Sequence, residues 1–181
     1  MSRLFAAISV AAVIVTAACN SGGGGDANAL PETNEQQNEI VANAASGQAT
    51  PQDHKAIMKA RHDHYEEMGR AMKGINTELK AGSPDVAAIQ RHAALIARYG
   101  PQILTWFPEG SGPEAGRTRA KAEIWSDAAT FRSAAERMQQ ASGAFDRAAQ
   151  SGDLAAIRAA LPELGNSCKN CHDRFRGPEQ D

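Results

Sequence analysis

The chain has 181 residues, three of them cysteines, and this length suits one domain with an appendage. Aromatic residues make up only 5% and alanine is frequent, which favours helices over a β-rich core. The formal net charge is −2, so the charge balance gives no reason to expect nucleic acid as a partner.

Residues 1–18 resemble an export signal. Arg3 supplies a positive charge, and the stretch that follows as far as Ala18 is almost wholly apolar or small. It is shorter than the roughly 20 apolar residues that span a bilayer, but it suits the core of a signal peptide. We therefore expect the mature chain in the periplasm of a Gram-negative bacterium.

Cys19 is a candidate site of lipidation. It follows Val15-Thr16-Ala17-Ala18, and small residues before a cysteine resemble the bacterial lipobox, although Thr16 replaces the usual Leu, Val or Ile. Lipid chains contribute about 0.8 kcal/mol per buried methylene. The prediction is a membrane-anchored lipoprotein, and the alternative is cleavage after Ala18 with release into the periplasm.

The next segment, residues 19–51, reads as a flexible tether. It contains a Gly-rich run, 21–25, four acidic residues and no lysine or arginine. Such a composition cannot bury a core, although a short helix near 35–45 is compatible with it. A tether behind a lipid-bearing cysteine would let a globular head move above a membrane.

The remaining residues, 52–181, show helical periodicity and predict four helices. The first covers 52–80 and ends where Gly82 and Pro84 follow. The second has Ser83 as its N-cap and Pro84 as its first residue, with a bend expected at Pro101. A loop rich in glycine and proline covers 108–116.

The third and fourth helices are predicted over 117–150 and 153–176, with Asp153 capping the fourth. Pro162 lies inside the fourth helix, where it removes a backbone donor and predicts a kink or a break. Four helices with mostly short loops predict an all-α, antiparallel four-helix bundle.

The string Cys168-Lys169-Asn170-Cys171-His172 is the attachment motif of c-type haem. Two thiols on one helical turn can each add to one haem vinyl group. The next residue, His172, then presents its imidazole to the iron. The motif predicts one covalently bound haem c near the C-terminus.

Three other roles for these cysteines are less compatible with the sequence. A structural zinc site usually has four ligands, and only three are clustered here. A thioredoxin-like pair needs a βαβ context, and the chain shows no strands. A plain disulfide gives no reason for the adjacent His172. A non-haem interaction protein with a disulfide is therefore the weakest hypothesis.

Several strings resemble the cytochrome c′ family, the four-helix class of c-type cytochromes with haem near the C-terminus. The resemblance covers about 52–178 and rests on four features: the run 168–176, the run 123–127 (EIWSD), Trp106-Phe107-Pro108, and Arg61 four residues before Tyr65.

This resemblance implies that His172 is the proximal iron ligand and that Tyr65 covers the opposite iron face. Iron would then be five-coordinate and high-spin, and NO or CO could bind if the phenol moved aside. In relatives resembling cytochrome c-556, a ligating methionine stands at this position, which leaves a six-coordinate electron shuttle as the alternative. In that case Met68, Met72 or His64 would be the sixth ligand; His64 is otherwise expected to be exposed or at the pocket rim.

Two arginines also have candidate roles. Arg61 lies on an apolar seam, where an unpaired charge is costly, so a haem propionate is an expected partner; a snorkelling side chain is the alternative. The resemblance places Arg176 near the proximal haem face, where it could raise the reduction potential and favour a proximal NO pocket. Otherwise it is a cation near a helix end. Trp125 is expected to pack, at a subunit contact or the haem edge.

The sequence thus predicts a haem protein for electron transfer and gas binding. No acid–base pair or nucleophile constellation is visible, so catalysis on an organic substrate is not expected. Expected partners are redox proteins, and family analogy suggests a homodimer through the first two helices.

Overall fold

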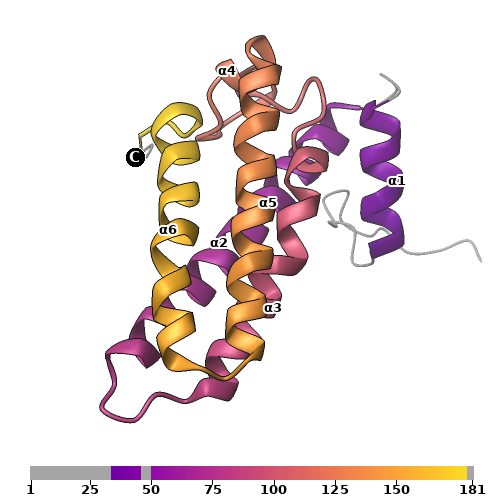
Figure 1. Ribbon diagram of the computed structural model, residues 1–181. Coiled ribbons are helices and arrows are strands. Elements are labelled where there is room, and N and C mark those ends of the chain that lie inside the picture. Colours follow the sequence, from indigo (N-terminus) through magenta and orange to yellow (C-terminus); the bar gives the residue numbers. More distant parts are fainter. Residues whose placement is uncertain (1–33, 46–49, 179–181) are drawn as a thin grey trace, which may run out of the picture.

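The computed structural model describes residues 34–45 and 50–178. Its elements are α1 (Asn34–Ala45), α2 (Pro51–Lys80), α3 (Val86–Tyr99), the 3₁₀ segments η1 (Gly100–Trp106) and η2 (Pro113–Ala115), α4 (Glu123–Ser126), α5 (Ala128–Gln150) and α6 (Leu154–Phe175). The long helices α2, α3, α5 and α6 form the predicted all-α four-helix bundle (Figure 1). The signal segment and Cys19 lie outside the described residues.

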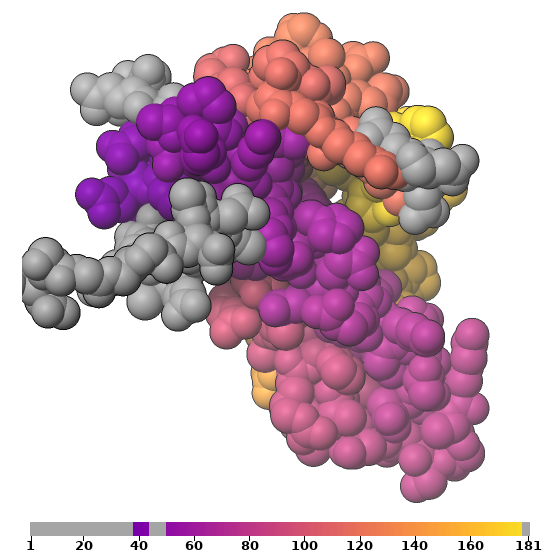
Figure 2. Space-filling model, turned by 180° about the vertical axis from the view of Figure 1, so that it is seen from behind, coloured from indigo at the N-terminus to yellow at the C-terminus, as the bar shows by residue number. Residues whose placement is uncertain are grey.

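Backbone packing in the bundle is uneven. α5 packs closely against α6, α2 against α3, and α3 against α5, whereas α2 and α6 share few close backbone approaches. α2 crosses behind α5 and α6 at an angle in Figure 1, and from the other side α6 is set back behind α2 (Figure 2). The side of the bundle between α2 and α6 is therefore not sealed by helix-to-helix contact.

The predicted apolar seams form the core. Side chains from all four long helices and η1 are buried together: Ile57, Met68, Ile75, Leu79, Ile89, Ile96, Ile103, Phe131, Met138, Phe145, Ile157 and Leu164. The 3-and-4 spacing brings each set onto one face of its helix, so burial follows directly from the sequence pattern.

Short polar side chains set where the helices begin. Asp153 caps α6 as predicted, accepting a hydrogen bond from the Ala155 N–H at 2.8 Å. The predicted cap at Ser83 is wrong. α3 begins two residues later than expected, because the Asp85 side chain accepts from the Ala88 N–H at 3.0 Å and so fixes the first turn.

The predicted start of the third helix at residue 117 is also wrong. Residues 117–122 are not helical, and α4 is separated from α5 by Asp127, whose backbone (φ −125°, ψ 53°) leaves the helix. Instead, this segment pairs with the end of the chain: the Lys121 N–H donates to the Phe175 carbonyl at 3.0 Å, and the Gly177 N–H to the Arg119 carbonyl at 2.7 Å.

Helix α1 packs on α2 outside the four-helix bundle (Figure 1). It confirms the short helix that the sequence allowed near 35–45. At Pro101, where a bend was expected, the 3₁₀ segment η1 has replaced α3; the bend itself stays a prediction. Within 34–45 and 50–178, no helix is long and apolar enough to cross a membrane.

Of the kink or break predicted at Pro162, the break does not occur, since α6 runs unbroken from Leu154 to Phe175; the kink stays a prediction. A proline cannot donate to the carbonyl four residues earlier, here that of Arg158. Pro162 and Arg158 are both exposed, so water can satisfy that carbonyl.

Replacing Pro162 with alanine should stabilise the protein by about 1–3 kcal/mol, because it restores a backbone donor and a good helix former. Urea unfolding followed by circular dichroism would measure the change. Gly165→Ala is a matched control on α6, where an added Cβ meets nothing within 4 Å, and should stabilise by about 1 kcal/mol. If Pro162→Ala destabilised the protein while Gly165→Ala stabilised it, the result would contradict this expectation and show that the proline sets the path of α6.

Candidate haem site

The two motif cysteines lie on the last turns of α6. Both side chains are half-buried, and the Cys168 Sγ lies 3.9 Å from the Met138 Sδ of α5. Burial raises the pKa of both thiols, that of Cys171 to about 11. The two thiols are free rather than joined in a disulfide. They are therefore available for thioether bonds.

The imidazole of His172 is half-buried beside them. Burial, followed by the positive charges of Arg176 and Arg119, lowers its pKa to about 4. At neutral pH it is therefore uncharged, which is the form that binds metal. No cluster of three or more metal-binding side chains occurs in the described part of the chain, so the zinc reading gains no support.

The ring of Tyr65 on α2 faces His172 across the open side of the bundle. The two ring centroids are 6.5 Å apart and the planes are inclined at 68°. The Tyr65 ring meets that of Trp106 edge-on, with centroids 5.3 Å apart, and its centroid lies 6.3 Å from that of Phe107. No described residue forms a hydrogen bond with the Tyr65 hydroxyl. Burial raises the pKa of the phenol. The predicted pair is thus brought together, and within the described residues packing holds the tyrosine.

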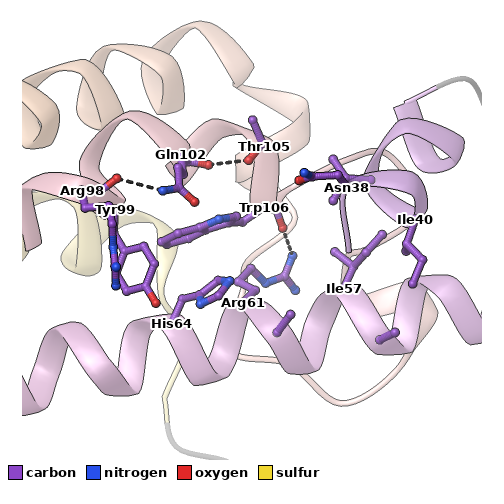
Figure 3. Close-up of a pocket in the computed structure, with 13 residues that line it drawn as sticks. Asn38, Ile40, Ile57, Arg61, His64, Arg98, Tyr99, Gln102, Thr105 and Trp106 are labelled. Atoms are coloured by element: carbon purple, nitrogen blue, oxygen red, sulfur yellow. Dashed lines mark hydrogen bonds between the residues drawn. The ribbon is translucent and has the colours of Figure 1, made fainter. Parts of the chain in front are cut away.

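The alternative ligands lie elsewhere. Met68 is buried in the core, and Met72 is half-buried against it. His64 is half-buried rather than exposed, and its ring lies 4.9 Å from both Tyr99 and Trp106. Figure 3 shows it lining a cavity beside α1. Among the ring contacts of the described residues, Tyr65 and not His64 meets His172.

Arg61 is a buried cation held by neutral oxygens. Its side chain is 4% exposed, which excludes the snorkelling alternative. Its guanidinium donates to the Trp106 carbonyl (3.1 Å), the Ser111 hydroxyl (3.2 Å) and carbonyl (2.9 Å), and the Thr118 hydroxyl (3.2 Å). Burial lowers its pKa to about 10. No described carboxylate forms an ion pair with it, although the charge of Glu114 acts on it.

These features fit a haem. Helix α6 carries two unbridged thiols and a neutral imidazole, and an aromatic side chain of α2 faces the imidazole. Few backbone contacts join the two helices. The buried charge of Arg61 suits an anionic group such as a propionate. The contact of Arg61 with a propionate remains a prediction, and so does the position of Tyr65 over iron.

Two arginines surround His172 at the C-terminal end. Arg176 is exposed just beyond α6; its N–H donates to the His172 carbonyl at 3.0 Å. Arg119 donates from Nε to the Gly177 carbonyl at 3.1 Å. The sequence indicated Arg176 but not Arg119, because Arg119 reaches the site only through the pairing of 119–121 with 175–177. The proposed effects of Arg176 on potential and NO remain predictions.

The loop before α4 is fixed by Trp125. Its indole N–H donates to the carbonyls of Phe107 and Pro108, both at 3.1 Å, and its ring lies 6.1 Å from that of Phe107. Its role within the described chain is therefore packing. Ser111 and Thr118, the partners of Arg61, carried no signal in the sequence because each is a single hydroxyl in an irregular segment.

Comparison with known proteins identifies the family. The sequence profile described as Cytochrome C′ matches residues 56–176, more than half of the chain. The chain belongs to the cytochrome c′ family. The family binds one covalent haem c, and Cys168 and Cys171 fit its attachment. Helix α1 lies outside the matched segment.

Individual cytochromes c′ show how far the similarity extends. That of Pararhodospirillum photometricum is 36% identical over 132 residues, which cover 73% of this chain and 99% of the relative. The cytochrome c′ of Rhodospirillum rubrum is 35% identical, and the alignment covers 75% of this chain and 87% of the relative. The crystal structure of cytochrome c′ from Rubrivivax gelatinosus aligns with a TM-score of 0.62 at 30% identity, covering 67% of this chain and 94% of that one.

A nitric oxide complex of a mutant cytochrome c prime from Alcaligenes xylosoxidans aligns with a TM-score of 0.63 at 30% identity. The alignment covers 72% of this chain and 98% of that one. The share of each relative that is covered shows that the similarity includes the whole bundle.

An ion pair ties this end of the bundle to α5. The Asp127 carboxylate accepts from the Thr130 N–H at 3.4 Å and from the Arg174 guanidinium at 2.5 Å. The bond to Thr130 and the charge of Arg174 lower the pKa of Asp127. A carboxyl group with a lowered folded-state pKa adds stability above its unfolded value, near 3.9, and loses it as the pH falls through the folded value.

Asp127→Asn should therefore lose less stability than the wild type between about pH 5 and pH 3, and should be less stable at pH 7. Asparagine still caps a helix, so the difference isolates the charge. Urea unfolding at each pH would measure it. The difference should shrink in about 1 M salt, where the Debye length is about 3 Å. Equal acid sensitivity of the two proteins would contradict this role.

Proposed function

We propose that this cytochrome transfers electrons and binds small gas molecules at a five-coordinate iron, with Tyr65 covering the face opposite His172. The main support for this proposal is that the centroid of the Tyr65 ring lies 6.5 Å from that of the His172 ring, and that the Tyr65 hydroxyl forms no hydrogen bond with a described residue. The haem, when bound, supplies one-electron chemistry and an iron position that a gas can occupy.

The protein residues would set access and charge. Among the described residues, Tyr65 makes ring contacts with Trp106, Phe107 and His172 and no hydrogen bond, so it can shield the iron and still turn aside for a diatomic molecule. A neutral phenol is a weak ligand in comparison with a methionine or a histidine. Arg119 and Arg176 place positive charge near His172, which favours the reduced state of the iron and raises its potential.

Solved relatives support gas binding. Structures of cytochrome c prime from Alcaligenes xylosoxidans include nitric oxide and carbon monoxide complexes of variants. We extend that property to this chain, and we infer that redox proteins are its partners and that no organic substrate is turned over. A homodimer through α2 and α3 is also inferred, and sedimentation of the haem-loaded protein would test it.

A low-spin electron shuttle is the second candidate. It is favoured by the position of Met68 and Met72 on α2, within two turns of Tyr65, because a modest shift of that helix would exchange one side chain for another. Such a protein would transfer electrons but exclude gases.

An optical spectrum of the ferrous, haem-loaded protein with and without CO would test the proposal. We expect a broad high-spin spectrum that shifts sharply when CO is added. Sharp, split α and β bands that CO leaves unchanged would indicate a strong sixth ligand and would favour the shuttle.

Variants of Tyr65 would show whether this side chain controls access. Tyr65→Ala should speed CO binding by roughly tenfold or more, whereas Tyr65→Phe should change it little, because the hydroxyl has no described partner. Met68→Leu and Met72→Leu are matched controls that keep the core filled and should leave the spectrum unchanged. Loss of a sixth-ligand spectrum in either methionine variant would refute the assignment of Tyr65.

We also propose that the chain is exported to the periplasm and anchored there by lipid on Cys19. The support is the apolar segment that ends in small residues before Cys19. Cell fractionation of the wild type and Cys19→Ala would test this. The wild type should sediment with membranes and the variant should be soluble in the periplasm; identical fractionation would argue for plain cleavage.

A further inference from the structure

A cavity of about 500 Å³ lies beside α1 (Figure 3), and His172 is not among its described lining residues. Three segments line it: α1 with Ile40 and Val41, α2 with Ile57 and His64, and the end of α3 with η1, where Tyr99 and Trp106 lie. A volume of this size suits one small organic molecule. The site differs from the haem site, although Arg61 and Trp106 border both.

The charge of the lining is one-sided. Arg61 and Arg98 are cations, and none of the described lining residues is acidic. Arg61 is buried and forms no ion pair with a described carboxylate. The nearest acidic influences on His64 come from Glu67 and Asp63, and Glu67 already accepts a 2.6 Å hydrogen bond from the Tyr99 hydroxyl. The cavity therefore favours an anion.

The shape of the lining specifies the rest of the molecule. Ile40, Val41 and Ile57 make one wall apolar. The opposite wall is aromatic, because Tyr99 and Trp106 meet edge-on at 5.5 Å with His64 against both. Aromatic walls accommodate flat ring systems well. At the edge, the exposed Arg98 holds its guanidinium 5.1 Å from the Tyr99 ring, where it can meet an anionic group.

We propose that this cavity binds an aromatic carboxylate, with the carboxylate toward Arg98 and the ring between the aliphatic side chains of α1 and the rings of Tyr99 and Trp106. The wall contributed by α1 lies outside residues 56–176, the part of the chain that the family profile matches.

Isothermal titration calorimetry of the full-length, haem-loaded protein would test the proposal, with 2-naphthoate as the probe and the uncharged 2-naphthamide as its isostere. Saturable binding of 2-naphthoate is expected, with roughly tenfold weaker binding of the amide, the usual effect of losing one charge-assisted hydrogen bond. Arg98→Ala should weaken 2-naphthoate by a similar factor and leave the amide unchanged. Arg91→Ala, an exposed arginine of α3 outside the cavity, should stay within about twofold.

A second pair of variants tests the α1 wall. Val41→Asp places a negative charge in the cavity and should abolish binding, whereas Ala42→Asp places the same charge on the exposed face of α1 and should have little effect. The proposal is overturned by absence of saturable binding, by equal binding of the amide, or by indifference to both Arg98→Ala and Val41→Asp. Binding that shifts the haem spectrum and ignores those variants would place the probe on the iron and equally overturn it.

Discussion

Packing around the Phe107 ring holds the two sides of the haem site in register. Its centroid lies 6.3 Å from that of the Tyr65 ring on α2 and 4.9 Å from that of the Phe131 ring on α5. The Phe131 centroid lies 5.2 Å from that of Phe175 on α6. Each such pair contributes about 0.5–1.5 kcal/mol beyond the burial of its surface. Because α2 and α6 share little backbone contact, this chain of rings, and not direct helix packing, sets where Tyr65 lies relative to the end of α6.

Arg61 shows how the same region carries a charge. A buried guanidinium is costly unless its donors are satisfied, and here neutral oxygens from η1 and the loop after it satisfy both terminal nitrogens. Its Cζ also lies 4.5 Å from the centre of the Phe107 ring. The residue therefore fastens the loop, and it leaves a positive charge at the cavity beside α1.

The sequence predicted the long helices well because helical burial repeats with a period of 3.6 residues. It misplaced the start of α5 for the same reason: Ile124 and Phe131 are both buried and seven residues apart, the spacing expected within one continuous helix, although Asp127 between them is not helical. The break at Pro162 was predicted from a lost donor alone. The exposure of that position, which lets water satisfy the Arg158 carbonyl, depends on tertiary packing.

In the candidate site too, residues marked by a local motif could be predicted, whereas residues that depend on tertiary contacts could not. Cys168, Cys171 and His172 could be read from five consecutive residues, and the structure brings Tyr65 opposite His172 as the family resemblance implied. Arg119, Ser111 and Thr118 could not be foreseen, since each reaches the site through contacts between segments 50 or more residues apart in sequence. The cavity beside α1 was missed because it combines three such segments.

The closely packed helix pairs follow one another along the chain, and this has a kinetic consequence. Bundles dominated by contacts between sequence neighbours fold within microseconds to milliseconds. α5 and α6 form such a hairpin, and in the finished structure Cys168 and Cys171 are already half-buried within it. Covalent attachment of the haem must therefore compete with a fast collapse that hides the two thiols, and any catalyst of that reaction is best served by capturing α6 while it is still unfolded.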